Sequence, residues 1–237
     1  MQVRVLTYNI RHGKGLDGRI SLGRTAGVIT AASADLVALQ EVDGYSLRSR
    51  FRNQAVVLGR SLGMKPSFGT TIKIAGLPVY GNAILSRLPV RRVSRWILPG
   101  KGERRGLIGI TADVEGAEIS FLTTHLGLSV EARREQVGKI IEVLRAVRQP
   151  FILTGDFNCT PEADELAPLF ALCRDAAAGL VQPTYPADSP RERIDYILVS
   201  SHWTVREVKE IKSKASDHLP VLAVLEPAEE PAAEEGS

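Results

Sequence analysis

The feature that most constrains the fold of this chain is a set of short apolar segments, each with polar residues at one of its ends. The segments are rich in β-branched side chains and have the length of strands rather than of helices. Asn, Asp and Glu are depleted in strands, so one such end alone indicates a turn or an edge charge. Seven of them in one chain suggest that the ends meet at one rim. The polar residues are Asn9, Glu41, Asn82, His125, Asp156 with Asn158, Asp195, and Asp217 with His218.

The same pattern predicts more strands than helices. Strands are expected over residues 3–10, 36–39, 83–85, 107–114, 119–124, 151–153, 194–199 and 219–225. The segment 107–114 alternates in part, as a half-exposed strand does. Ser21 and Ser129 are typical helix N-caps, and each is followed by apolar residues at helical spacing. Many strands and few helices favour two sheets packed face to face with helices outside.

The chain of 237 residues shows no internal linker and no clear repeat. A single domain over residues 1–225 is therefore predicted, followed by an acidic, disordered tail over residues 226–237. That tail holds five glutamates, so its removal raises the formal net charge from +3 to +8. A basic body favours anionic partners, nucleic acid among them.

The chain has no segment that suggests export or membrane insertion. No apolar run approaches the roughly 18 residues that a membrane span needs, and the N-terminus does not read as a secretory signal. Its two cysteines, Cys159 and Cys173, have no zinc-type spacing. A cytoplasmic monomer with reduced thiols and no membrane anchor is predicted.

The polar strand ends predict a metal site if they converge. Carboxylates and amides without thiolates suit a hard cation such as Mg²⁺ or Mn²⁺. Such an ion can bridge to a phosphate oxygen and act as a Lewis acid, and the histidines offer proton transfer near neutral pH. Arg104 and Arg105 precede one strand and could hold a substrate phosphate, although a solvated charged surface is the more common role for such residues.

Each of the polar residues lies in a short sequence block. The blocks are Tyr8-Asn9-Ile10, Leu39-Gln40-Glu41-Val42, Gly81-Asn82-Ala83-Ile84-Leu85-Ser86, Thr124-His125-Leu126, Gly155-Asp156-Phe157-Asn158, Arg193-Ile194-Asp195-Tyr196-Ile197 and Ser216-Asp217-His218-Leu219-Pro220. Taken together, these blocks resemble those of the endonuclease/exonuclease/phosphatase superfamily, to which DNase I, AP endonucleases and neutral sphingomyelinases belong. The resemblance covers residues 3 to 225, with the blocks in the family's order.

The resemblance implies a four-layer α/β sandwich of two mixed, mostly antiparallel sheets with helices outside, and a divalent-metal site. It implies that Glu41 is the principal metal ligand, with Asn9 and Asp217 nearby in the metal shell. Asp156 would orient or deprotonate the attacking water, and Asn158 would hold the scissile phosphate.

The resemblance also implies roles for the remaining polar residues. Asp195 would accept a hydrogen bond from His218 and fix the tautomer of its imidazole, and His218 would act on the phosphate or as general base. His125 would be the general acid or a donor to a phosphate oxygen. Asn82 would help to organise the site by hydrogen bonding, although a turn-forming role is also open.

The leading hypothesis from the sequence is a compact phosphodiesterase or nuclease that needs Mg²⁺ or Mn²⁺. One alternative is a phosphomonoesterase or phospholipid head-group hydrolase with the same site. Another is a non-catalytic protein that binds anions or nucleic acid. The presence of all the predicted site carboxylates together with His218 argues against this alternative. The substrate, the number of metal ions and the division of acid and base roles between the histidines stay open at this stage.

Overall fold

The computed structural model describes residues 2–179 and 182–228, which build two six-stranded sheets. The first sheet has the order β11-β12-β1-β2-β4-β3. Its only parallel pair is β1 with β2, and every other neighbouring pair is antiparallel. The strands are β1 (Val3–Asn9), β2 (Leu36–Asp43), β3 (Lys65–Ile74), β4 (Leu77–Ser86), β11 (Trp203–Glu210) and β12 (Val221–Pro227).

The second sheet repeats this arrangement. Its order is β5-β6-β7-β8-β10-β9, and its only parallel pair is β7 with β8. The strands are β5 (Val90–Ile97), β6 (Gly106–Val114), β7 (Ala117–His125), β8 (Phe151–Asp156), β9 (Arg174–Asp175) and β10 (Asp195–Val199). Both sheets are thus mixed and mostly antiparallel, as predicted.

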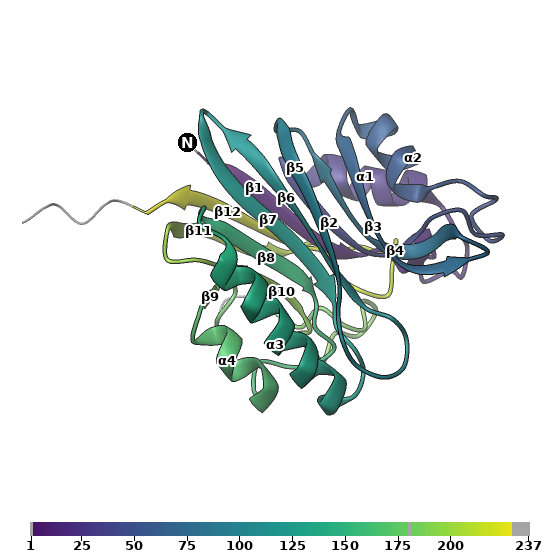
Figure 1. Cartoon of the computed structure of the whole chain (residues 1–237). Helices are drawn as coiled ribbons and strands as arrows, with labels where there is room; N and C mark the ends of the chain where they lie inside the picture. Colours follow the sequence, from purple (N-terminus) through teal and green to yellow (C-terminus); the bar gives the residue numbers. More distant parts are fainter. Residues whose placement is uncertain (1, 180–181, 229–237) are drawn as a thin grey trace, which may run out of the picture.

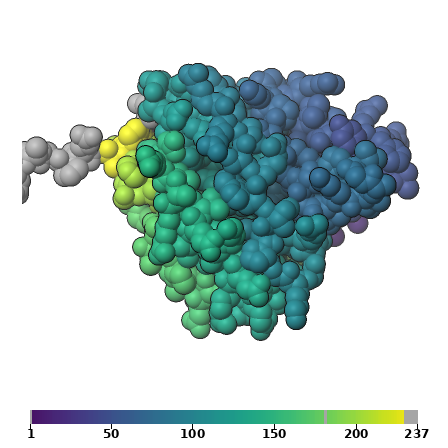
Figure 2. All heavy atoms as spheres, in the orientation of Figure 1, coloured from purple at the N-terminus to yellow at the C-terminus, as the bar shows by residue number. Residues whose placement is uncertain are grey.

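Helices cover the outer face of each sheet, which completes four layers (Figure 1). Helices α1 (Leu22–Ala32) and α2 (Gln54–Leu62) pack on the first sheet. Helices α3 (Val130–Ala146) and α4 (Ala167–Phe170) pack on the second. Ser129 caps α3 through a bond from the Ala132 N–H, whereas Ser21 precedes α1 without a side-chain cap. The space-filling view shows the two halves of the chain meeting without a break on this face (Figure 2).

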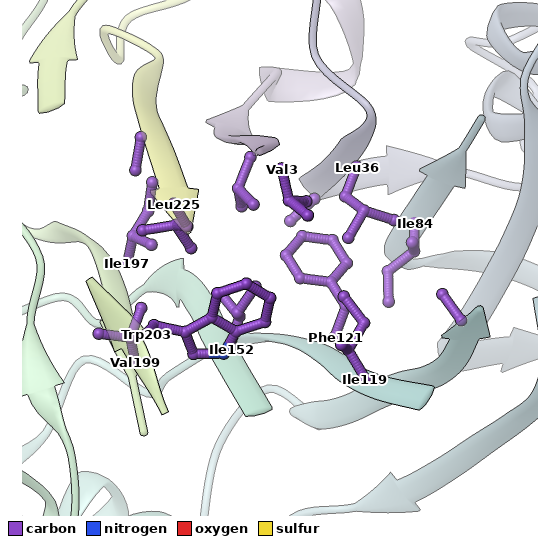
Figure 3. Packing of buried hydrophobic residues seen from close by; sticks show 14 of the residues in the cluster. Val3, Leu36, Ile84, Ile119, Phe121, Ile152, Ile197, Val199, Trp203 and Leu225 are labelled. Carbon is purple, nitrogen blue, oxygen red and sulfur yellow. The ribbon is translucent and has the colours of Figure 1, made fainter. Parts of the chain in front are cut away.

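The central core lies between the two sheets. Side chains such as Val3 and Leu36 from the first sheet meet Phe121 and Ile152 from the second, and Trp203 fills the space beside them (Figure 3). All five are at least 98% removed from solvent. Trp203 is thus a core residue.

Two sequence-based predictions, one about a strand limit and one about exposure, are wrong. Strand β12 continues to Pro227, and the Ala228 N–H still donates to the His202 carbonyl, so the tail does not begin at Glu226. Glu226 instead accepts a hydrogen bond from Gln2. Residues 229–237 of the predicted tail lie outside the described residues. Strand β6, predicted as half exposed, is mostly buried because the second sheet is covered on both faces.

The sequence pattern did not predict strands β3, β5, β9 and β11 or helices α2 and α4. Strands β5 and β11 are largely polar, and β5 lies at a sheet edge, where charged side chains are tolerated. Helix α2 carried a signal that was overlooked. Asn53 caps it by accepting from the Val56 N–H, and Gly63 ends it with a left-handed backbone.

Within the described residues, no helix combines the length and the apolar character needed to cross a membrane.

The two cysteines are expected to be unreactive in the folded protein. Cys159 and Cys173 are free and buried, and burial raises the pKa of each thiol to about 12. Because the thiolate is the nucleophile, we expect negligible reaction with 5,5′-dithiobis(2-nitrobenzoate) at pH 8 in native protein and two equivalents in urea. Rapid release of one equivalent from folded protein would contradict this prediction.

Candidate active site

The strand order explains why the polar ends meet. The single parallel pair of each sheet brings two carboxyl ends to the same edge: Asn9 and Glu41 in the first sheet, and His125 and Asp156 in the second. An antiparallel neighbour contributes its beginning at that same edge. Asp195 at the start of β10 therefore lies opposite Asp156, and the residues just before β12 come beside the end of β1. The stacked sheets bring the two edges together.

Asp156 is the residue on which the site converges. Its Oδ2 accepts a hydrogen bond from Asn9 Nδ2 at 2.9 Å and faces the Nε2 atoms of His125 at 3.5 Å and His218 at 3.6 Å. Its Oδ1 accepts the Asn158 backbone N–H at 3.0 Å. The side chain is almost completely buried. This carboxylate is held in one orientation by hydrogen bonds from Asn9 and from the Asn158 backbone.

The glycine before Asp156 is required by close packing. A Cβ at Gly155 would lie 2.1 Å from the carbonyl oxygen of Thr124 on the neighbouring parallel strand. Gly155 also has φ of +150°, which side-chain-bearing residues rarely adopt. The glycine thus lets β8 approach β7 and places Asp156 level with His125.

Glu41 reaches the site through an irregularity in β2. The register between β2 and β4 shifts between Leu39 and Val42, and Glu41 has φ of +55°. Bulges of this kind re-aim a side chain at a sheet edge. Its neighbour Gln40 points between the sheets, where it donates to the hydroxyls of Thr7 and Thr123. The bulge frees Glu41 to turn toward Asn9, which donates to its Oε1 at 3.2 Å.

The environment of Glu41 is rich in negative charge. Burial raises the pKa of Glu41 above its ordinary value, the hydrogen bond from Asn9 opposes the rise, and the Asp156 and Asp217 carboxylates add to it. Asn9 separates Glu41 from Asp156, and its own Oδ1 accepts the Arg11 N–H. A bound cation would offset the repulsion among these carboxylates and favour their charged forms.

His218 is oriented by a buried carboxylate. Its Nδ1 lies 3.0 Å from Asp195 Oδ2, and the Thr184 hydroxyl donates to the same oxygen. The Tyr185 ring packs against the imidazole at 4.7 Å between centroids. Burial lowers the pKa of His218, but the charge of Asp195 and the hydrogen bond to it, with Asp156 and Asp217, raise it overall to about 10. In this arrangement the ring is an imidazolium at neutral pH and faces Asp156 with Nε2–H.

His125 has the opposite electrostatic character. Burial lowers its pKa to about 4, Asp156 opposes this, and Arg105 adds to the decrease. The Arg105 guanidinium lies 3.1 Å from His125 Nδ1. Because arginine can only donate, Nδ1 must be the acceptor, and the proton of the neutral ring lies on Nε2. His125 therefore presents a neutral N–H donor beside Asp156.

The sequence suggested that Arg105 could hold a substrate phosphate or belong to a solvated charged surface, whereas in the structure it is engaged within the protein. Its side chain is buried, contacts His125 and pairs with Glu103 at 2.8 Å. Arg104, the other residue predicted to bind phosphate, is exposed.

The remaining predicted residues surround this centre. Asp217 pairs with Arg11 at 3.2 Å. Asn158 has φ of +52° and donates its side-chain amide to the Leu126 carbonyl, so that its amide nitrogen is already bonded. Asn82 donates to the Gly106 carbonyl and so joins β4 to β6 across the two sheets. Its predicted role in organising the site stays a prediction.

Three residues that contact the site were not predicted from the sequence. Thr184 and Tyr185 lie in a proline-containing loop, and Arg11 directly follows the Asn9 block. Arg11 could have been suspected from its position. Thr184 and Tyr185 carried no local signal, because the fold alone brings that loop against Asp195 and His218.

The donor set fits a hard divalent cation. Carboxylate oxygens of Asp156 and Asp195 lie within 4.8 Å of each other, beside His218, in the described residues. Glu41 and Asp217 add carboxylate oxygens, and burial, with a smaller contribution from the Asp156 and Asp217 charges, raises the pKa of Glu41. Oxygen donors of this kind are those that Mg²⁺ and Mn²⁺ prefer. Glu41 and Asp217 are the residues expected to hold the ion, with Asn9 placing Glu41.

Comparison with known proteins supports the same interpretation. The model of the Endonuclease/Exonuclease/phosphatase family matches residues 6–218. A solved structure of an endonuclease/exonuclease/phosphatase from Beutenbergia cavernae is similar, with a TM-score of 0.82 and 27% identity over 98% of this chain and 73% of that one. A second, from Bacteroides vulgatus, has a TM-score of 0.81 and 21% identity over 96% of this chain and 100% of that one.

A mannosyl-6-phosphatase from Bacteroides thetaiotaomicron shares the fold as well. Its TM-score is 0.76, with 21% identity over 94% of this chain and 99% of that one.

Proposed function

Since this chain belongs to the endonuclease/exonuclease/phosphatase family, whose enzymes are metal-dependent phosphoesterases, we propose that it hydrolyses phosphodiesters with the help of Mg²⁺ or Mn²⁺. The observation that carries the proposal is the buried Asp156 carboxylate, on which Asn9 and two histidines of opposite electrostatic character converge. A cytoplasmic location and a monomeric state belong to the same proposal.

The proposed reaction is attack of water on phosphorus, with cleavage of the bond between phosphorus and the leaving oxygen. Bound Mg²⁺ or Mn²⁺ would supply Lewis acidity at a phosphate oxygen. Asp156 is suited to orient the attacking water and to accept its proton, because both carboxylate oxygens are held in place.

The histidines are suited to different parts of this reaction. His218, as an imidazolium, is suited to donate to a phosphate oxygen rather than to act as base. His125, as a neutral Nε2–H donor, is suited to contact a phosphate oxygen or the leaving group. Between the alternatives that the sequence left open for these residues, the charge state of each ring supports the donor role.

The first test compares bis(p-nitrophenyl) phosphate with p-nitrophenyl phosphate. We expect wild-type protein with Mg²⁺ or Mn²⁺ to cleave the diester and to lose this activity in EDTA, with recovery when either metal is restored. Glu41→Ala should lower diester hydrolysis by about 10²-fold or more at equal metal concentration, because the charge that holds the ion is removed. Undiminished turnover in EDTA would contradict the metal requirement.

The relative rates on the two substrates decide between the candidate activities. Cleavage of the monoester alone would favour a phosphomonoesterase, the kind of activity that the name of the mannosyl-6-phosphatase gives to that protein. Arg91→Ala is a suitable control, because Arg91 is exposed and pairs with Asp113 near the turn that joins β6 to β7. This variant should retain wild-type activity.

A further inference from the structure

An apolar cleft opens directly beside the candidate active site. It has a volume of about 630 Å³ and is lined at one end by Glu41 and His12. Its walls come from the loop after β2 and from the β3–β4 hairpin. Its size lies in the range of small-molecule sites, which are typically apolar with a few polar groups at one end. A ligand whose phosphate lies at Glu41 would extend into this cleft.

Exposed apolar side chains gather at the rim of this cleft. Of the nine large apolar side chains exposed in the described part of the chain, five line it. These five are Tyr45, Leu47, Phe51, Ile74 and Leu77. Single exposed apolar residues are ordinary on a protein surface, but a contiguous group of them indicates a binding surface.

The composition of the cleft favours a hydrocarbon over a nucleobase. Its lining includes the aliphatic side chains of Ile72 and Val79, beside the ring of Tyr80. Among the polar groups of the lining, Asp43 is already bonded, since it accepts from both Arg48 and Ser46. An alkyl chain needs apolar contact alone, whereas a buried base needs a partner for each of its donors and acceptors.

Positive charge lies on the other side of the same loop. A second depression, which shares Arg48 with the cleft, is lined by Arg19, Arg48, Arg50 and Arg52. The loop therefore presents apolar side chains to one cavity and guanidinium groups to the next.

We propose that the cleft is a subsite for the hydrocarbon chain of an amphiphilic phosphodiester, whose phosphate lies at Glu41. This inference rests on the proposed function for the identity of the substrate. It narrows that function by naming the substrate class, a phosphodiester that carries an alkyl chain. The chain would be bound between Leu47 on the loop and Leu77 on the hairpin.

Two series of compounds test the subsite. In the first, ethyl and octyl p-nitrophenyl phosphate share one leaving group and differ only in chain length. We expect kcat/KM in Mg²⁺ or Mn²⁺ to be at least about tenfold higher for the octyl ester, because each buried methylene adds to binding. In the second, butyl and decyl phosphate are titrated calorimetrically in EDTA, and decyl phosphate is expected to bind at least about tenfold more tightly.

The double variant Leu47→Ser/Leu77→Ser should remove most of the chain-length effect in both series. These side chains are 79% and 51% exposed, so their replacement should not disturb the core. Leu128→Ser is the matched control, because Leu128 is 76% exposed and does not line the cleft. It should keep the full effect.

The outcomes separate this inference from the proposed function. The hydrocarbon subsite would be overturned if kcat/KM were equal for the ethyl and octyl esters and the affinity were equal for butyl and decyl phosphate. A higher kcat/KM for thymidine 5′-(p-nitrophenyl phosphate) than for the octyl ester would also overturn it. Failure to hydrolyse any of the diesters would overturn the proposed function, and the calorimetric series would still decide whether the cleft binds alkyl chains.

Discussion

Replacing Asp156 with asparagine is expected to lower kcat/KM for bis(p-nitrophenyl) phosphate by about 10³-fold, which corresponds to roughly 4 kcal/mol of transition-state stabilisation. Asparagine has the same shape and can still accept the Asn158 N–H at one oxygen. It cannot accept a proton from water, and it removes the charge that the two histidines face. Steady-state kinetics in saturating Mg²⁺ or Mn²⁺ measures the loss.

A chemically identical change elsewhere serves as the control. Asp113→Asn alters a carboxylate that pairs with Arg91 near the C-terminal end of β6. The candidate site lies at the other end of this strand, near Gly106. The kcat/KM of Asp113→Asn should match wild type. Circular dichroism and thermal melting establish that both variants are folded. A folded Asp156→Asn protein with wild-type turnover would exclude Asp156 from the reaction.

Changes to the His218–Asp195 pair are expected to be strongly non-additive. His218→Ala should lower kcat/KM by about 10²- to 10⁴-fold, because the donor to phosphate is lost. Asp195→Asn should lower it less, since the histidine stays but loses the carboxylate that orients and charges it. The double variant should be no worse than His218→Ala, because groups that act as a unit are lost together. Independent, additive losses would show that Asp195 does not act through His218.

The same pair is expected to make stability depend on pH. The pKa of His218 is raised to about 10 in the folded protein, against an ordinary value near 6.5. The pair therefore stabilises the fold fully below about pH 6.5, and its contribution is lost as the pH rises toward 10. In EDTA, the difference in unfolding free energy between wild type and His218→Gln should shrink from pH 6.5 to pH 9.5. Urea denaturation at several pH values measures it.

The sequence predicted the chemistry of the site well because that chemistry is local. Short apolar runs specify strands, and a carboxylate or amide at the end of such a run is unfavourable unless the fold gives it a partner. Asn9, Glu41, Asp156 and His218 could be selected on this basis, and the structure brings them together. Strands with many polar residues, such as β11, were not predicted, since their pattern resembles that of a loop.

Contacts between residues that lie far apart in the sequence could not be predicted from local pattern. Thr184 and Tyr185 contact Asp195 and His218 only because strand order brings their loop to the site. Arg105 carries a charge that suits a phosphate, yet the fold buries it against His125.

By itself, the sequence determined the fold class, the residue types of the site and the kind of metal that they suit, because these depend on composition and on local pattern. Only the tertiary structure decided that Glu41 turns inward at a bulge, that His218 is charged while His125 is neutral, and that an apolar cleft opens beside them. These properties arise from the register between strands and from burial. Both depend on contacts between residues distant in the chain, which no local pattern specifies.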